Sequence, residues 1–270
     1  MNKIRQNFRR FLQDFYLVLI MLFLYAPIAT MVVLSFNSSK SRTQWGGFTL
    51  QWYTQMFASR NIMAALQNTL LIAFLSALIA TIIGTAASIA ISSMKQIPQT
   101  IVMGITNIPM LNADIVTGIS LMLAFIAFGV SLGFKTVLIA HITFNIPHVI
   151  LTVAPKLRQL DRNLVDAAKD LGCTWMQAFW KVILPEIKPG IVSGALIAFT
   201  MSIDDFIISY FTAGTSSTLA MTIYGMTKKR VSPEINAVST LLFVTVLALL
   251  AIVNIREARQ EKLAAAQRAR

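Results

Sequence analysis

Three acidic side chains interrupt long apolar stretches of this chain: Asp114, Asp204 and Asp205. An ionised carboxylate at the centre of a lipid bilayer costs about 2.5 to 3.5 kcal/mol even on lenient insertion scales. Acids in such surroundings therefore need a compensating role, and a bound cation would supply it. Two aromatic residues that follow, Phe206 and Tyr210, could present their rings to an ammonium group. These five residues form the predicted binding site for a small cationic solute.

Other interpretations of the three acids stay open at the level of sequence. Each acid could be protonated, or hydrogen-bonded to polar residues of neighbouring helices, and would then be structural. Asp114 and the Asp204 region could couple a cation to protons in a secondary transporter. Asp114 and Asp204 could in principle hold the water of an intramembrane aspartyl protease, although nothing else in the chain supports hydrolysis. Because adjacent positions on a helix diverge by about 100 degrees, Asp204 and Asp205 cannot both point at one ligand atom.

The two histidines, His141 and His148, are seven residues apart and therefore lie on one face of a helix. Two histidines without a nearby third ligand make a weak metal site. Helix packing or hydrogen bonding is the favoured interpretation of both, and no metal site is predicted.

The composition places the elements that carry these residues in a membrane. Of the 270 residues, 56% are hydrophobic and only 13% are charged, which leaves too little polar surface for a water-soluble protein of this size. A helix needs about 20 apolar residues to cross a bilayer. We predict an all-α membrane domain over residues 15–255, with short tails at 1–14 and 256–270. Its six spans are expected near residues 15–36, 67–92, 101–127, 136–155, 190–211 and 235–255.

The distribution of basic residues predicts the orientation of these spans. The two tails, the loop near residue 95 and the loop at 156–188 together carry 16 of the 23 Lys and Arg residues. Basic residues favour the cytoplasmic side, so both termini are expected in the cytoplasm. The net charge of +12 then acts as an orientation signal and attracts anionic lipid headgroups. No nucleic-acid partner is needed to explain it.

A polar hairpin at about 161–188 separates two of the apolar runs. Asp161 or Asn163 can cap a first helix, and Gly172 suits the left-handed conformation that ends it. Thr174 and Gln177 have the spacing of a capping box for a second helix. That second helix is expected to end just before Pro185.

The hairpin resembles the EAA loop of binding-protein-dependent ABC import permeases, in which Glu-Ala-Ala, a glycine and an aliphatic-x-Leu-Pro stretch recur at fixed spacing. The one departure is Asp for the first Glu, which keeps the charge but shortens the side chain. The matching residues are Asp166, Ala167, Ala168, Gly172, Val182, Leu184 and Pro185.

The resemblance implies a type I permease fold in the inner membrane of a bacterium. It implies three protein partners: a cytosolic ABC ATPase dimer docked on the hairpin, a second homologous permease and an extracytoplasmic binding protein. The chain has no G-x-x-x-x-G-K-[ST] loop for ATP. The expectation is therefore a transport subunit without catalytic residues or a cofactor of its own, while ATP and Mg²⁺ bind to the partner ATPase.

A narrower resemblance extends over about residues 15–255. The strings FNSSKS, WGGFTLQWY, NADIVTG, SIDDFIISYF and VSPEINAVSTL are similar to those of polyamine (spermidine and putrescine) permeases, particularly the second permease of each pair. The substrate implied is a short aliphatic polycation. An ABC permease for a different small solute, and an ATP-independent cation transporter, are the alternatives.

Three aromatic residues stand out in the first external loop: Trp45, Trp52 and Tyr53. Aromatic residues of this kind gather at membrane interfaces, so an interfacial belt is the favoured interpretation. A seat for an extracytoplasmic binding protein is the alternative.

Overall fold

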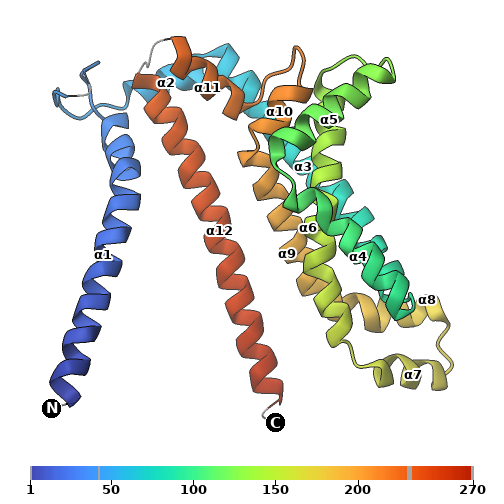
Figure 1. Cartoon of the computed structure of the whole chain (residues 1–270). Coiled ribbons are helices and arrows are strands. Elements are labelled where there is room, and N and C mark those ends of the chain that lie inside the picture. Colours follow the sequence, from blue (N-terminus) through green and yellow to red (C-terminus); the bar gives the residue numbers. More distant parts are fainter. Residues whose placement is uncertain (1, 42, 230–232, 269–270) are drawn as a thin grey trace. The chain divides into compact units, whose positions relative to one another are not determined.

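A computed structural model describes residues 2–41, 43–229 and 233–268, and it consists of helices joined by short loops (Figure 1). The described residues contain one isolated β-bridge, Asn37 with Phe48, and no longer strand. The all-α prediction is confirmed.

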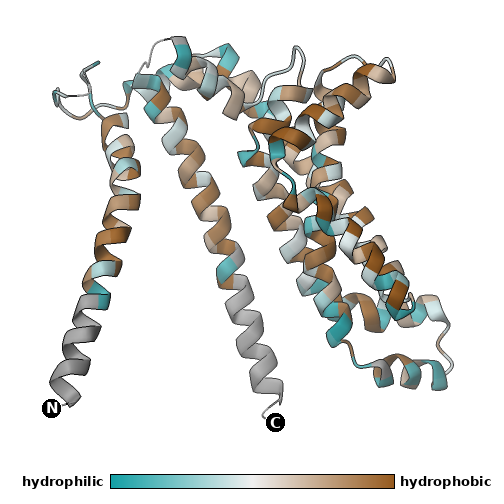
Figure 2. Ribbon diagram, viewed as in Figure 1, coloured by the Kyte–Doolittle hydropathy of each residue, from teal (hydrophilic) through white to brown (hydrophobic). Residues whose placement is uncertain are grey.

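Within the described residues, the apolar helices (Figure 2) supply five candidate membrane spans, or six if a bent pair counts as one span. The number and order of the predicted spans agree with this set, although several boundaries differ. The spans are Gln13–Ser35, Arg60–Ser92, Phe134–Gln159, Trp175–Asp204 and Pro233–Ile252, with Gln96–Leu111 and Asp114–Ala127 as the bent pair.

The chain forms two compact units. The first comprises the residues up to Met63 together with Ile223–Val244. It contains α1 (Asn2–Ser35), α2 (Gln51–Ala58), most of α11 (Leu219–Lys229) and the beginning of α12 (Pro233–Arg268).

The loop between α1 and α2 is folded around Asn37, which is 1% exposed. The Asn37 side chain donates to the carbonyl oxygen of Gln44 (2.8 Å) and accepts from the amide of Gly46 (2.8 Å). Trp52 is buried and donates its indole N–H to the Asn37 carbonyl oxygen at 2.7 Å. Trp52, in the first turn of α2, therefore packs against the folded loop, whereas Trp45 is exposed.

The second unit, Ala64–Thr222 with the residues from Thr245 onward, carries all the predicted functional residues. Its helices are most of α3 (Arg60–Ser92), then α4 (Gln96–Leu111), α5 (Asp114–Ala127), α6 (Phe134–Gln159), α7 (Arg162–Asp170), α8 (Trp175–Ala178), α9 (Leu184–Asp204) and α10 (Ile207–Thr212).

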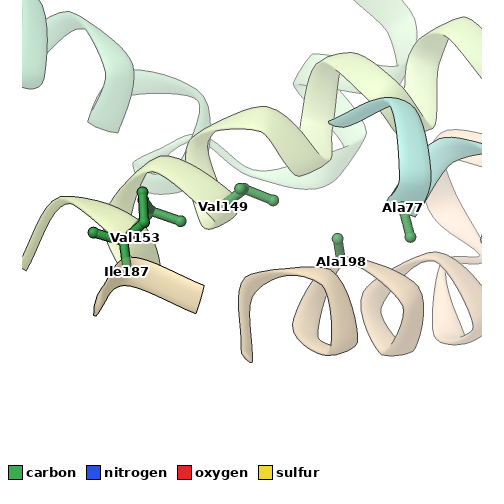
Figure 3. Packing of buried hydrophobic residues seen from close by; sticks show 5 residues of the cluster. All are labelled: Ala77, Val149, Val153, Ile187 and Ala198. Carbon is green, nitrogen blue, oxygen red and sulfur yellow. The ribbon is translucent and has the colours of Figure 1, made fainter. Parts of the chain in front are cut away.

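Close packing of α6 on α9 forms the centre of this unit. The α9 face consists of small residues at four-residue intervals, Gly190, Gly194, Ala198 and Ser202, all buried. Small residues at this spacing let two helix backbones approach closely in a membrane. A Cβ on Gly190 would lie 3.1 Å from the Thr152 carbonyl oxygen of α6. Figure 3 shows the adjoining apolar cluster of Ala77, Val149, Val153, Ile187 and Ala198.

The third predicted span, near 101–127, is a bent pair of helices rather than one straight helix. α4 ends at Leu111, α5 begins at Asp114, and the two helices meet at 100°. Pro109 removes a late hydrogen bond of α4, and Asn112 and Ala113 then adopt extended backbone (ψ 148° and 135°). Asp114 is consequently the first residue of a helix rather than a mid-helix residue.

The fifth predicted span differs at both ends. α9 stops at Asp204 because Asp205 is extended (ψ 118°), and α10 starts at Ile207. At the other end, the helix does not stop before Pro185. α8 continues through a π-helical segment, Phe179–Ile183, into α9. Pro185 lies in the first turn of α9, where a missing N–H costs little.

Candidate functional site

The hairpin at 161–188 has the local structure that its sequence predicts. Asp161 caps α7 by accepting from the Asn163 amide at 2.9 Å. Gly172 ends that helix at φ +83°. Thr174 and Gln177 form a reciprocal capping box at the start of α8, with distances of 3.0 and 3.4 Å.

The residues that match the EAA pattern are spread along this hairpin. Asp166, Ala167 and Ala168 lie in α7, and the Asp166 carboxylate is 3.8 Å from the exposed Lys169 ammonium. Val182 lies in the π-helical segment, and Leu184 and Pro185 begin α9. Leu184 also packs against the α6–α9 apolar cluster.

Large apolar side chains are exposed on the same hairpin, although α7 itself is largely hydrophilic (Figure 2). The side chain of Leu171 is 86% exposed, and those of Trp175, Met176 and Trp180 are also mostly exposed. An exposed apolar surface next to a hydrophilic helix fits a protein-docking surface.

The structure brings Asp114 and Asp204 to the same end of one helix pair. α5 packs along α10: a Cβ on Gly118 would lie 3.1 Å from the Phe211 ring and 3.4 Å from Ile208 Cα. The turns that follow the two helices also meet, because a Cβ on Gly214 would clash with the Leu132 backbone. The two helices therefore run in the same direction.

Asp114 precedes Gly118 by one helical turn, about 6 Å, and Asp204 lies three residues before the start of α10. Both side chains are exposed in this chain. Two accessible carboxylates are thus presented at two helix breaks, at one end of the α5–α10 pair.

Asp205 has different surroundings from its neighbour Asp204, since its side chain is only 8% exposed. Its two oxygens accept from the backbone amides of Ile208 (3.2 Å) and Ser209 (2.8 Å), which caps α10. The His141 Nε2 atom lies 3.2 Å from Oδ2. The structure accordingly gives the Asp205 carboxylate protein partners, whereas it leaves the Asp204 carboxylate exposed.

The two predicted aromatic residues lie beside the second break. The rings of Phe206 and Tyr210 are 5.4 Å apart. Tyr210 is half-exposed and also meets Phe211 edge-on, at 5.5 Å. Both aromatic side chains therefore lie beside the break that follows Asp204.

Sequence reasoning missed the part that His141 plays. His141, on α6, is 2% exposed and contacts Ser202 through Nδ1 and Ser209 through Nε2 (2.9 Å). Hydrogen bonding or helix packing was the favoured interpretation of His141. The hydrogen-bond partners of its ring, however, lie 61 and 68 residues away in the sequence, and no local pattern identifies them. The repeat of small residues at every fourth position from Gly190 to Ser202 is the sequence pattern that indicates close packing of α9 on another helix.

His148 contacts only its own helix among the contacts that the structure records, through Nδ1 and the Phe144 carbonyl oxygen at 3.1 Å and through the Phe144 ring. Across the part of the chain that the structure describes, no three His, Cys, Asp or Glu residues converge as metal ligands would.

Helices that cross a membrane repeatedly, a capped polar hairpin and acids at helix breaks define a membrane transport subunit. A family model agrees: residues 76–262 match the binding-protein-dependent transport system inner membrane component. The match covers more than half of the chain, so the chain belongs to this family. The prediction of a transport subunit rather than an enzyme is confirmed by this membership.

Individual relatives are similar over most of the chain. The spermidine/putrescine transport system permease protein PotC of Haemophilus influenzae is 37% identical, over 90% of this chain and 95% of that protein. PotC of Escherichia coli K12 is 38% identical over 87% and 89%. The E. coli putrescine transport system permease protein PotI is 35% identical over 92% of each.

Solved structures support the fold alone, since their identities are low. A chain of a bacterial ABC transporter that imports the acidic polysaccharide alginate superposes with a TM-score of 0.74 at 14% identity, over 94% of this chain and 98% of that one. A chain of the MetNI methionine ABC transporter gives 0.61 at 21% identity, over 76% and 97%.

Proposed function

We propose that this chain is the permease subunit of an ATP-driven importer whose cargo is a polyamine such as putrescine or spermidine. The observation that carries the proposal is the placement of two exposed carboxylates, Asp114 and Asp204, at the same end of α5 and α10. The names of the relatives narrow the cargo from a cation to a polyamine.

The chemistry of the site suits an aliphatic polycation. A polyamine carries ammonium groups separated by short methylene chains, so separate carboxylates can each hold one charge through a charge-assisted hydrogen bond. The Tyr210 ring can face an ammonium group or the methylene chain. Asp205 would contribute indirectly, by capping α10 behind Asp204.

The hairpin would couple this site to ATP hydrolysis. Its exposed apolar residues would seat on a dimer of cytosolic ATPases, which would bind the ATP and Mg²⁺. Both termini would then face the cytoplasm, in agreement with the distribution of basic residues. A second homologous permease would complete the pathway, and an extracytoplasmic polyamine-binding protein would deliver the cargo.

Uptake by the complete complex in vesicles tests the cargo. Putrescine and spermidine should enter only when ATP is supplied to the ATPase side, while a neutral diol of matched length should not enter. Losing a charge-assisted hydrogen bond costs about 1.5 to 3 kcal/mol, so Asp114→Asn and Asp204→Asn should each lower uptake at low amine concentration by roughly 10- to 150-fold. Asp14→Asn, an exposed acid in α1, is the matched control and should transport normally.

Equal uptake of the amine and the neutral diol would contradict the proposed cargo. Uptake that continues without ATP would contradict the proposed energy source.

A further inference from the structure

A buried polar network crosses the break between α9 and α10, and the proposed transport chemistry does not use it. The network joins four helices and is closed to solvent, with every member 8% exposed or less. Its members are Ser76 on α3, His141 on α6, Ser202 on α9, Asp205 in the break and Ser209 on α10.

His141 is the centre of this network because its two ring nitrogens face opposite sides of the break. Nδ1 meets the Ser202 hydroxyl, which precedes the break. Nε2 meets the Asp205 carboxylate at 3.2 Å and the Ser209 hydroxyl at 2.9 Å, which follow it. One imidazole ring therefore ties the end of α9 to the start of α10.

The protonation pattern follows from the partners. Asp205 accepts two backbone N–H groups, as an ionised carboxylate does, and an ionised carboxylate has no proton to donate. Nε2 must therefore carry the hydrogen. Nδ1 can then accept from Ser202, whose oxygen lies 3.0 Å from the Ser76 hydroxyl on α3. The resulting chain of hydrogen bonds anchors the break to two further helices.

Ser202, His141 and Asp205 contain the three residue types of a hydrolytic triad, but the geometry does not support that chemistry. A nucleophilic hydroxyl must be reachable by substrate. Ser202 is 3% exposed and also contacts Ser76. The ring instead joins two segments of backbone, which is a positioning role.

We propose that His141 is a positioning residue for the transported cation. It holds the α9–α10 break in one geometry and so fixes the direction of the Asp204 carboxylate and of the Phe206–Tyr210 ring pair, without touching the cargo itself. This inference rests on the proposed function, because it gives Asp204 the role of a cation ligand.

Two variants of the complete complex separate positioning from mere packing. His141→Leu keeps an apolar side chain but removes both ring nitrogens. His141→Gln keeps an amide N–H that can reach toward Asp205. The matched control is His148→Leu, on the same helix and seven residues away, whose ring nitrogen bonds only to its own helix among the recorded contacts.

Concentration series of putrescine and spermidine uptake provide the readout. We expect His141→Leu to raise the KM by roughly tenfold or more, the size of one charge-assisted hydrogen bond, and to alter the preference between the diamine and the triamine. His141→Gln should stay within about threefold of the unsubstituted complex, and His148→Leu should match it. In an Asp204→Asn background, His141→Leu should add little, because coupled residues are not additive.

Unchanged KM and preference in His141→Leu would overturn the inference. Full additivity with Asp204→Asn would overturn it too, because His141 would then act elsewhere. If His141→Leu does not assemble, the double variant His141→Leu with Asp205→Asn, which leaves no unpaired carboxylate, decides between the two outcomes in the same assay. Failure of the unsubstituted complex to take up any amine would refute the proposed function instead.

Discussion

Two acids adjacent in the sequence, Asp204 and Asp205, have opposite surroundings. Asp204 ends α9 with an exposed side chain, whereas Asp205 is extended and turns its carboxylate into the protein to cap α10 and meet His141. The sequence predicts that the two carboxylates cannot point at one ligand atom, and their separation has a structural basis. That basis is a break in the helix rather than the angle between neighbouring positions on an unbroken one.

This difference predicts opposite effects of substitution. Asp205→Ala removes a helix cap and leaves the buried His141 without its carboxylate partner. Losing the cap costs about 1 kcal/mol and breaking a buried pair costs more, so a loss on the order of 2 to 4 kcal/mol is expected. The measurement is the thermal unfolding midpoint of the purified complex in lipid nanodiscs.

Asp204→Asn is the control for this stability prediction. It should leave the midpoint unchanged because the Asp204 side chain is exposed, while it reduces uptake. If Asp205→Ala unfolded at the same temperature as Asp204→Asn, the assignment of Asp205 to capping and pairing would be wrong.

At the scale of elements, one unbroken helical segment joins the hairpin to Asp204, and it changes direction between α8 and α9 (Figure 1). It runs from Trp175 through the π-helical segment to Asp204, 30 residues in all, which is about 45 Å at 1.5 Å per residue. The row of small residues from Gly190 to Ser202 lets α9, the last part of this segment, pack closely against α6. A force applied at the hairpin would thus reach the α9–α10 break through a single element.

A substitution at Gly172 tests the hairpin end of this helical segment. Its φ of +83° disfavours any side chain, although a Cβ there would meet nothing within 4 Å. A left-handed conformation costs a non-glycine residue about 1 to 2 kcal/mol, and a β-branched one is a stronger outlier. Gly172→Val should therefore change the turn, lower co-purification of the ATPase and reduce uptake more than tenfold, with membrane insertion intact.

Gly129 provides a matched control for the hairpin, because it has a similar φ of +69° and equally open surroundings in the turn after α5. Gly129→Val should retain the ATPase. Equal retention of the ATPase by the two variants would count against docking at the hairpin.

The sequence predicted these elements unequally. The caps of the hairpin, from Asp161 to Gln177, were predictable because their hydrogen bonds join residues two or three positions apart. The breaks at 112–113 and 205–206 were not predicted as breaks, although polar residues interrupt the apolar pattern at both, because extended backbone at one or two residues is what ends each helix there. The contacts of His141 depend on packing between helices, which no local pattern encodes.

At the scale of the whole molecule, the family and the near-complete coverage by PotC and PotI identify a permease subunit. The two compact units divide its features. The first unit contains the loop folded around Asn37 and Trp52. The second unit contains the hairpin, the helical segment from Trp175 to Asp204, and the predicted acidic site residues. The features that the proposed mechanism requires therefore lie within one packed unit.

In the proposed mechanism, ATP hydrolysis drives a polyamine past Asp114 and Asp204. The most direct measurement records ATP hydrolysed and spermidine taken up in the same vesicles, for the unsubstituted complex and for the double variant Asp114→Asn with Asp204→Asn. We predict uptake that requires ATP in the first, and in the second an assembled complex that still hydrolyses ATP but takes up little spermidine. Spermidine uptake by the double variant at the unsubstituted rate would contradict this mechanism.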